Sequence, residues 1–252
     1  MNRFENFLQL HNTPTPLLLG NCWDVSSAKL LEENGFKAIG TSSAALARSL
    51  GYEDGENLPF TLLLETVKRI QQSISVPLSV DMEKGYSSSS CGILENIMQL
   101  HSIGVVGINI EDSGNRIIGD AATFAETISL IANYLAQKNI PLFINARTDA
   151  FLLDLPGALE ETIIRAKLYE NAGANGIFVP FIKKVTDIKT ITAATALPVN
   201  VLAAPGLPDI ATLTASGVRR ISMGSSLFNA LKREAVNKIK LITEKGSFDP
   251  LF

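Results

Sequence analysis

Short apolar runs alternate with amphipathic segments along the whole chain, and this alternation constrains the fold more than any other feature. Eight runs of β-branched and aliphatic residues have the length of strands: Leu17–Asn21, Ala38–Ser42, Leu78–Met82, Val105–Glu111, Leu142–Arg147, Gly176–Pro180, Val199–Ala203 and Val218–Met223. Eight stretches with helical spacing follow them: Val25–Glu33, Leu62–Ser73, Ile93–Ser102, Ala122–Gln137, Ala158–Asn171, Val185–Ala194, Leu207–Thr214 and Ser226–Thr243. Several strand runs are continuously apolar, as expected of parallel strands that are covered on both faces.

Glycine and proline mark the junctions between these segments. Four glycines follow a predicted helix and precede a predicted strand: Gly35, Gly104, Gly173 and Gly217. Three prolines stand at strand entries, where no ladder hydrogen bond is lost: Pro77, Pro141 and Pro198. Eight strand–helix units in 252 residues match the size of a TIM barrel, so we predict an α/β fold, a (β/α)8 barrel, as one domain over residues 1–252. An open, doubly wound sheet shares the alternation and is the alternative.

Composition narrows the class of protein. A chain with 46% hydrophobic residues buries a substantial core, and its net charge of −3 gives no electrostatic argument for binding nucleic acid or an anionic membrane. Met1–His11 lacks the apolar centre of a signal peptide, and no stretch approaches the roughly 20 apolar residues of a membrane span. Cys22 and Cys91 are too few for a disulfide framework. We therefore expect a cytoplasmic protein whose partners include neither nucleic acid nor membrane.

Charged residues follow three of the predicted strands at their ends. Val80–Glu83, Ile108–Asp112 and Ile144–Asp149 each continue an apolar run. Because the carboxyl ends of parallel strands open onto one face, Asp81, Glu83, Glu111 and Arg147 are predicted to converge. Asp81 and Glu83 alternate along one strand and point the same way, which suits Mg²⁺, an ion that takes one or two protein carboxylates and keeps several waters. The guanidinium of Arg147 is able to grip a carboxylate in two parallel hydrogen bonds.

Each of these residues also has a purely structural interpretation. The acids are equally acceptable as helix caps or solvated loop residues, and Arg147 as an ion-pair brace with Glu111 or Asp149. The loop Gly40–Ala44 brings backbone N–H groups close to an anion, a signal that is weak alone. Asp54 is a further candidate acid or a turn residue.

Lysine and cysteine offer a different chemistry. Lys84 or Lys183 would serve a Schiff-base aldolase, although a solvated lysine is the more ordinary interpretation. Cys22 is interpreted as a small buried side chain, and Cys91 has no histidine partner in sequence.

Several motifs, in order, resemble those of the isocitrate lyase/phosphoenolpyruvate mutase superfamily, to which 2-methylisocitrate lyase and the phosphonomutases belong. The matching segments cover nearly the whole chain: Gly20–Val25, Ala28–Phe36, Asp81–Tyr86, Gly107–Ser113, Asn145–Asp149, Val201–Gly206 and Ser222–Ser226. The resemblance implies a modified TIM barrel whose eighth helix packs against a neighbouring subunit in a dimer or tetramer. It also implies Mg²⁺-dependent making or breaking of a C–C or P–C bond beside a 2-oxo acid, with Mn²⁺ as a substitute ion.

The same resemblance assigns roles by position. Asp81 would bind the metal directly, and Glu83, Glu111 and Asp54 would hold it through water; Glu111 and Asp54 also join Arg147 in the catalytic set. The substrate carboxylate would meet Thr41, Ser42, Ser43 and Asn109 as well as Arg147. The metal and Arg147 would together stabilise a pyruvate-like enolate.

The chain departs from the superfamily pattern in the segment that follows Glu111. Isocitrate and methylisocitrate lyases carry Lys-(Lys/Arg)-Cys-Gly-His there, whereas Asp112–Asp120 contains neither cysteine nor histidine, nor the Lys and Asn-Ser pair of the phosphonate enzymes. Glu83 replaces a more frequent aspartate, and Ser43 replaces a glycine.

We therefore expect a Mg²⁺-dependent C–C lyase that acts on a small 2-oxo or hydroxy di- or tricarboxylic acid. An oxaloacetate-type decarboxylase, a phosphonopyruvate hydrolase or phosphoenolpyruvate mutase-like enzyme, and a non-catalytic carboxylate-binding homologue are the alternatives.

Overall fold

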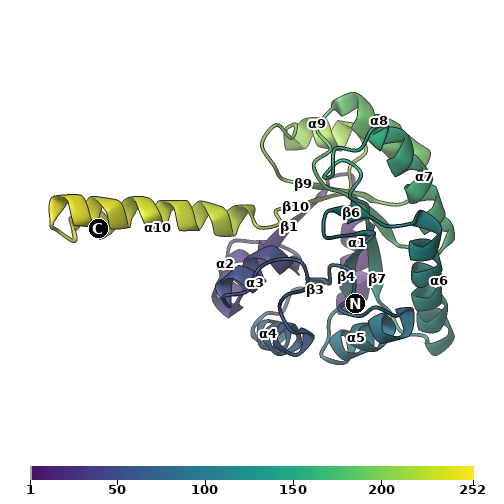
Figure 1. Ribbon diagram of the computed structural model, residues 1–252, viewed down its shortest axis with the longest axis horizontal. Helices are drawn as coiled ribbons and strands as arrows, with labels where there is room; N and C mark the ends of the chain where they lie inside the picture. The colour runs from purple at the N-terminus through teal and green to yellow at the C-terminus, as the bar shows by residue number, and fades with distance from the viewer. Residues whose placement is uncertain (1) are drawn as a thin grey trace.

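The computed structural model describes residues 2–252, and its centre is a closed barrel of eight parallel strands (Figure 1). In barrel order these are β1 (Leu17–Cys22), β2 (Ile39–Thr41), β3 (Leu78–Asp81), β4 (Gly107–Glu111), β7 (Phe143–Arg147), β8 (Gly176–Val179), β9 (Val199–Leu202) and β10 (Arg220–Ser222). Strand β1 pairs with β2 on one side and with β10 on the other, which closes the barrel. The predicted (β/α)8 barrel is confirmed, and the open sheet is excluded.

All eight predicted helices are present, with small shifts at their ends. They are α2 (Val25–Glu33), α4 (Phe60–Ser73), α5 (Ser90–Ser102), α6 (Ala121–Lys138), α7 (Ala158–Asn171), α8 (Val185–Ala194), α9 (Ile210–Ala215) and α10 (Ser226–Lys245). The main core lies between the barrel and the helices that surround it, where Leu63, Ile97 and Ile131 are fully buried. Within residues 2–252, no helix has the length and apolar character needed to span a membrane.

Several short elements were not predicted. They are α1 (Arg3–Leu10), α3 (Ser43–Ser49), the hairpin strands β5 (Ser113–Gly114) and β6 (Ile117–Ile118), and the 3₁₀ turn η1 (Asp249–Leu251). Helix α1 closes the amino-terminal end of the barrel: Phe7 is fully buried, and its ring meets the ring of Phe143 edge-on at 5.5 Å. His11 is buried beside them and stacks on Phe143, far from the carboxyl ends of the strands.

The barrel interior is layered, as the register of β4 and β7 shows. Gly107 pairs with Phe143 in the lowest layer, Asn109 with Asn145 in the middle one, and Glu111 with Arg147 at the top. The middle layer is polar and also contains the buried guanidinium of Arg220. Asn109 Oδ1 accepts hydrogen bonds from Asn145 Nδ2 at 2.9 Å and from Arg220 Nη2 at 3.1 Å. The charged residues at the carboxyl ends of the strands therefore lie directly above a layer of polar side chains.

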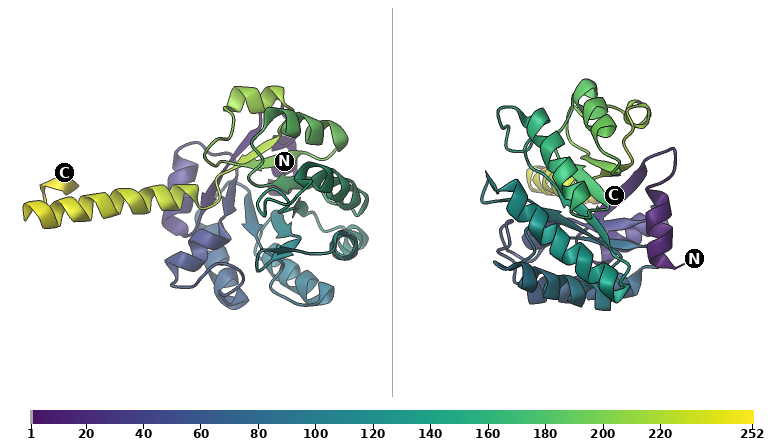
Figure 2. Two further views of the ribbon diagram at one scale, coloured as in Figure 1. Left: turned by 45° about the horizontal axis from the view of Figure 1, so that its top comes forward. Right: turned by 90° about the vertical axis from the view of Figure 1, so that its right-hand side faces the viewer.

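Helix α10 departs from the usual barrel arrangement, because it projects away from the barrel instead of lying on it (Figures 1 and 2). None of its residues is buried, and Leu231, Val236 and Ile239 are exposed. At its root a groove of about 690 Å³ runs between α9 and the outer faces of β1 and β10, where Leu18 is 41% exposed. This groove is the place that an eighth helix occupies in a barrel.

Candidate active site

An acid-lined pocket of about 490 Å³ opens at the carboxyl ends of the strands. Its walls are Ser43, Asp54, Gly55, Glu56, Glu83, Lys84, Glu111, Ser113, Gly114, Asn115, Arg116, Arg147, Asp149, Leu152 and Leu153. Five of the predicted site residues are among them: Ser43, Asp54, Glu83, Glu111 and Arg147. The loops after β2, β3, β4 and β7 supply most of this wall, so residues more than one hundred positions apart share one pocket.

Arg147 is held between two carboxylates. Its Nη1 lies 2.6 Å from Glu111 Oε2, and its Nε and Nη2 donate to the two oxygens of Asp149 at 2.7 and 3.0 Å. Burial opposes the charge of Arg147, but Glu111 and Asp149 outweigh burial and raise the pKa of the guanidinium above its usual value. Burial also raises the pKa of Glu111 well above normal, against the pull of Arg147. The ion pairs of the structural interpretation are therefore present, and they also hold Arg147 as a fixed cation at the pocket.

Asp81 lies beside the pocket wall and keeps one oxygen free. Its Oδ2 accepts from Ser43 Oγ at 2.8 Å and from Ser43 N at 3.3 Å, and its backbone N–H donates to Thr41 Oγ1 at 2.9 Å. Its Oδ1 is buried and has no hydrogen-bond partner among residues 2–252. A buried carboxylate oxygen without a partner is costly unless a ligand meets it.

The other acids of the pocket repel one another and Asp81. Burial, with Asp81 and Asp54 nearby, raises the pKa of Glu83 to about 7, and burial and Asp81 raise the pKa of Asp54. Glu83 has a left-handed backbone with φ 48°, and its carboxylate accepts from Glu56 N at 2.8 Å and from Tyr86 Oη at 2.9 Å. A divalent cation would relieve this repulsion.

The donor set fits Mg²⁺ in a specific way. No group of three His, Cys, Asp or Glu side chains in the described part of the chain could enclose a metal directly. Mg²⁺ does not need one, since it takes one or two carboxylates and binds the rest through water. The free oxygen of Asp81 could bind the ion directly, and Glu83, Glu111 and Asp54 could hold its water ligands.

The remaining predicted substrate contacts are turned toward the protein. Thr41 accepts from Asp81, Ser42 Oγ accepts from Ala45 N at 3.3 Å and caps α3, and Asn109 is bonded within the polar layer. None of these three lines the pocket, whereas Ser43 and Arg147, from the same predicted set, do. Lys183 does not line it, whereas Lys84 does. Cys22 is fully buried, Cys91 is exposed, and both are free thiols.

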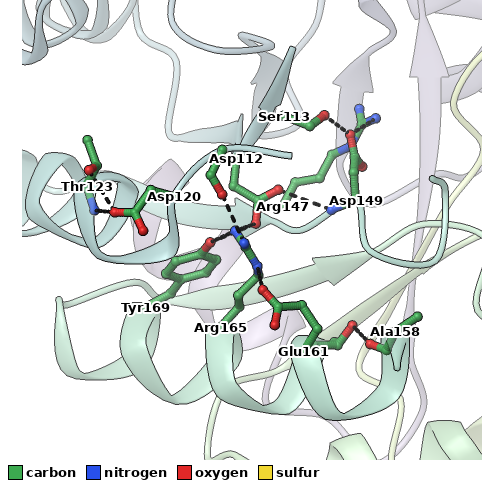
Figure 3. A network of polar contacts seen from close by, with 12 residues as sticks. Asp112, Ser113, Asp120, Thr123, Arg147, Asp149, Ala158, Glu161, Arg165 and Tyr169 are labelled. Atoms are coloured by element: carbon green, nitrogen blue, oxygen red, sulfur yellow. Dashed lines mark hydrogen bonds and ion pairs between the residues drawn. The ribbon is translucent and has the colours of Figure 1, made fainter. Parts of the chain in front are cut away.

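A buried polar network, absent from the sequence predictions, anchors the segment after Glu111 (Figure 3). Asp112 Oδ2 pairs with Arg165 Nη1 at 2.9 Å and accepts from Tyr169 Oη at 2.7 Å. Arg165 Nη2 donates to the carbonyl of Gly119 at 2.9 Å, and Gly119 N donates to the carbonyl of Asp112 at 2.7 Å. The two ends of the β5–β6 hairpin are therefore tied together and to α7. In the sequence, the four-residue spacing of Arg165 and Tyr169, which places both on one helix face, could have pointed to this network.

The chain is similar to known proteins along nearly its full length. The family model described as phosphoenolpyruvate phosphomutase matches residues 7–243. A Mycobacterium tuberculosis protein, described as uncharacterized, is 35% identical over 95% of this chain and 89% of its own length. An oxaloacetate decarboxylase of Rhodopseudomonas palustris is 30% identical over 86% of this chain and 77% of its own length.

A solved structure agrees with the sequence matches. A Burkholderia cenocepacia protein, provisionally described as a phosphonomutase, superposes with a TM-score of 0.90 at 33% identity, covering 95% of this chain and 98% of its own. A family match over more than nine-tenths of the chain, together with the closed barrel and the acids at its strand ends, leaves one conclusion: this chain belongs to the phosphoenolpyruvate phosphomutase family, within the isocitrate lyase/phosphoenolpyruvate mutase superfamily.

Proposed function

We propose that the chain is a Mg²⁺-dependent C–C lyase that acts on a small 2-oxo or hydroxy di- or tricarboxylic acid through a pyruvate-like enolate. The observation that carries this proposal is the free Asp81 oxygen beside the charged, doubly braced Arg147. Asp81, with Glu83 and Glu111, would hold the metal, for which Mn²⁺ is a chemically similar substitute. When bound, the ion would supply positive charge to the enolate oxygen.

The chain's own residues do the remaining work. Arg147 faces the pocket with its charge fixed in place, so it stabilises negative charge on the substrate oxygens without having to reorganise. Ser43 keeps Asp81 oriented through two hydrogen bonds. Thr41, Ser42 and Asn109 remain predicted substrate contacts, and Ser43 is the one that already lines the pocket. Asp54, a member of the predicted catalytic set, lines the pocket and has a raised pKa, so it would serve as a proton carrier there.

Decarboxylation of an oxaloacetate-like acid is the second candidate. It is favoured by the hairpin Asp112–Asp120, which offers no cysteine or histidine as a proton donor, and by the 30% identical oxaloacetate decarboxylase. In that reaction the bond between C3 and the distal carboxylate breaks, CO₂ leaves, and C3 of the pyruvate enolate takes a proton from water. No resident acid on the hairpin is required.

Metal removal tests both candidates at once. With Mg²⁺, the protein is mixed separately with oxaloacetate, 2-methylisocitrate, isocitrate and phosphonopyruvate. From one of these acids, ¹H NMR is expected to show product forming above the rate without enzyme: glyoxylate with succinate from isocitrate, and pyruvate from any of the others. With EDTA the excess should disappear, because the enolate charge loses its main counter-ion. Turnover that EDTA leaves unchanged would favour Schiff-base chemistry, and no turnover by a folded, Mg²⁺-binding protein would favour a binding role.

We also propose that a second copy of the chain covers the groove beside α9 with its own α10. The groove lies where the eighth helix of a barrel belongs, and the chain's eighth helix points elsewhere with apolar residues exposed. The exchange would produce a dimer or tetramer.

Charge on the apolar side of α10 should break this assembly. The double variant Val236→Glu/Ile239→Glu is expected to convert the oligomer to monomer, because carboxylates would be forced into an apolar interface. Size-exclusion chromatography with light scattering measures the mass directly. Asn237→Glu/Lys240→Gln, two exposed positions on the same helix, lowers the net charge by the same two units and is the matched control. A monomeric wild-type protein would contradict the exchange.

A further inference from the structure

Two cations at the mouth of the active-site pocket have no ion-pair partner in the part of the chain that the structure describes. They are Lys84, directly after β3, and Arg116, at the tip of the β5–β6 hairpin, and both line the pocket. The third cation of the pocket, Arg147, is already bonded to Glu111 and Asp149. Lys84 and Arg116 are exposed and therefore available to a ligand.

The backbone at Arg116 is in a conformation that glycine would adopt more easily. Gly114 pairs with Ile117, so Asn115 and Arg116 form a two-residue hairpin loop, with φ of 51° and 61°. Loops of this kind prefer Asn at the first position and Gly at the second. The chain follows the first preference and departs from the second. A side chain retained in an unfavourable backbone conformation beside a pocket is a reason to look for a function.

Lys84 is confined by the same hairpin. A Cβ atom placed on Gly114 would lie 2.6–2.8 Å from Cδ, Cε and Nζ of Lys84, so strand β5 runs directly against the lysine side chain. Glycine at position 114 leaves the room that the lysine needs. The hairpin in turn is fixed by the buried pair of Asp112 and Arg165 (Figure 3). The hairpin that carries Arg116 thus also packs on Lys84, and both cations line the pocket before any ligand arrives.

We propose that Lys84 and Arg116 bind a second carboxylate of the substrate, at the end that lies away from Asp81 and Arg147. This inference rests on the proposed function and adds the two residues that would recognise the second anionic group of its substrate. A carboxylate between a guanidinium and an ammonium accepts charge-assisted hydrogen bonds from both. A site built in this way rejects an analogue that lacks the group.

The position of the cations also bears on which bond breaks. Decarboxylation turns a charged carboxylate into neutral CO₂, and two cations on that carboxylate would stabilise the substrate more than the transition state. Cleavage of a C–C bond elsewhere leaves the second carboxylate charged throughout. Lys84 and Arg116 therefore favour the lyase over the decarboxylase.

Binding of oxalate and of malate to the Mg²⁺-loaded protein tests the inference by titration calorimetry. If ¹H NMR of the same mixture shows malate turning over, its KM replaces its Kd in the comparison. Oxalate is short enough to occupy only the end with Asp81 and Arg147, whereas malate extends toward the hairpin. Arg116→Gly and Lys84→Met are each expected to weaken malate at least about tenfold and to change oxalate by less than about twofold. Arg116→Gly should not lower the melting temperature, since glycine suits the turn.

Two control variants test whether a changed loop backbone, or the loss of any lysine, would by itself weaken malate binding. Asn115→Gly alters the same loop and keeps the cation, and Lys183→Met removes a lysine outside the pocket; both should bind malate as the wild type does. Unchanged malate affinity in Arg116→Gly and Lys84→Met, with oxalate still bound, would overturn this inference alone. Equal weakening of both acids would also overturn it. Failure of the wild type to bind oxalate would overturn the proposed function as well.

Discussion

Replacing Arg147 by lysine is expected to lower kcat by about 100-fold or more while the barrel stays folded. Lysine keeps the positive charge but has a single nitrogen, so it cannot bond Glu111 and both oxygens of Asp149 at once. The ammonium would move toward one carboxylate and leave the developing enolate without its fixed counter-charge. Steady-state kinetics with the acid that the Mg²⁺-dependent assay identifies gives kcat and KM separately.

Stability separates this effect from a general disturbance. Asp149 retains a hydrogen bond from Ser113 Oγ in the variant, so the melting temperature should fall by only a few degrees. Arg69→Lys, in the exposed pair with Glu65, is a suitable control and should change neither rate nor stability. A large loss of stability with an unchanged kcat would show that Arg147 only braces the barrel.

Breaking the buried pair of Asp112 and Arg165 is expected to destabilise the fold by about 3–5 kcal/mol. The Asp112 side chain is fully buried and that of Arg165 is 4% exposed, so Arg165→Met leaves a carboxylate without its counter-charge and away from water. Burial already raises the pKa of Asp112, against the hydrogen bond from Tyr169 and the charge of Arg165. Urea unfolding gives the free energy of unfolding of each variant.

The double variant Asp112→Asn/Arg165→Met makes the test specific. Removing both charges together should restore much of the stability, because no buried charge is left unpaired. Arg165→Met alone should also free the ends of the hairpin, which Gly119 now ties to Arg165 and Asp112. A loss below about 1 kcal/mol in Arg165→Met would show that the pair contributes no more than an exposed ion pair.

Most of the architecture was predictable because the chain repeats one pattern eight times, an apolar strand run followed by an amphipathic helical segment. Each strand is an apolar run, and parallel strands must be buried on both faces, so the pattern alone selects an α/β fold. Helix α1 escaped prediction because eight residues hold little periodicity; its signals are the Asn2–Glu5 capping box and the buried ring of Phe7. Helix α3 was missed because Gly40–Ala44 was interpreted as a loop. Ser42 caps a helix there, and the small residues that follow it give little helical periodicity.

The site was predictable only in part. The position of a residue at a strand end indicates where its side chain lies, but not which group it forms a hydrogen bond with. The convergence of Glu83, Glu111 and Arg147 followed from the strand-end rule and is present in the pocket. The partners of Thr41 and Ser42 did not follow, because a hydroxyl bonds equally well to a backbone group or a ligand. The pair of Asp112 with Arg165 spans 53 positions, and no local pattern records such a contact.

The polar middle layer of the barrel has a consequence for how the acids above it ionise. Barrel interiors are usually filled with branched aliphatic side chains, which would surround Asp81 and its neighbours with a medium of low dielectric from below. Here the buried side chains of Asn109, Asn145 and Arg220 form a hydrogen-bonded polar layer instead. These polar groups make the medium beneath the carboxylates less unfavourable to their charge than an aliphatic layer would be. Filling the layer with leucine or valine would raise the pKa values of Glu83 and Glu111 further and move cation binding to higher pH.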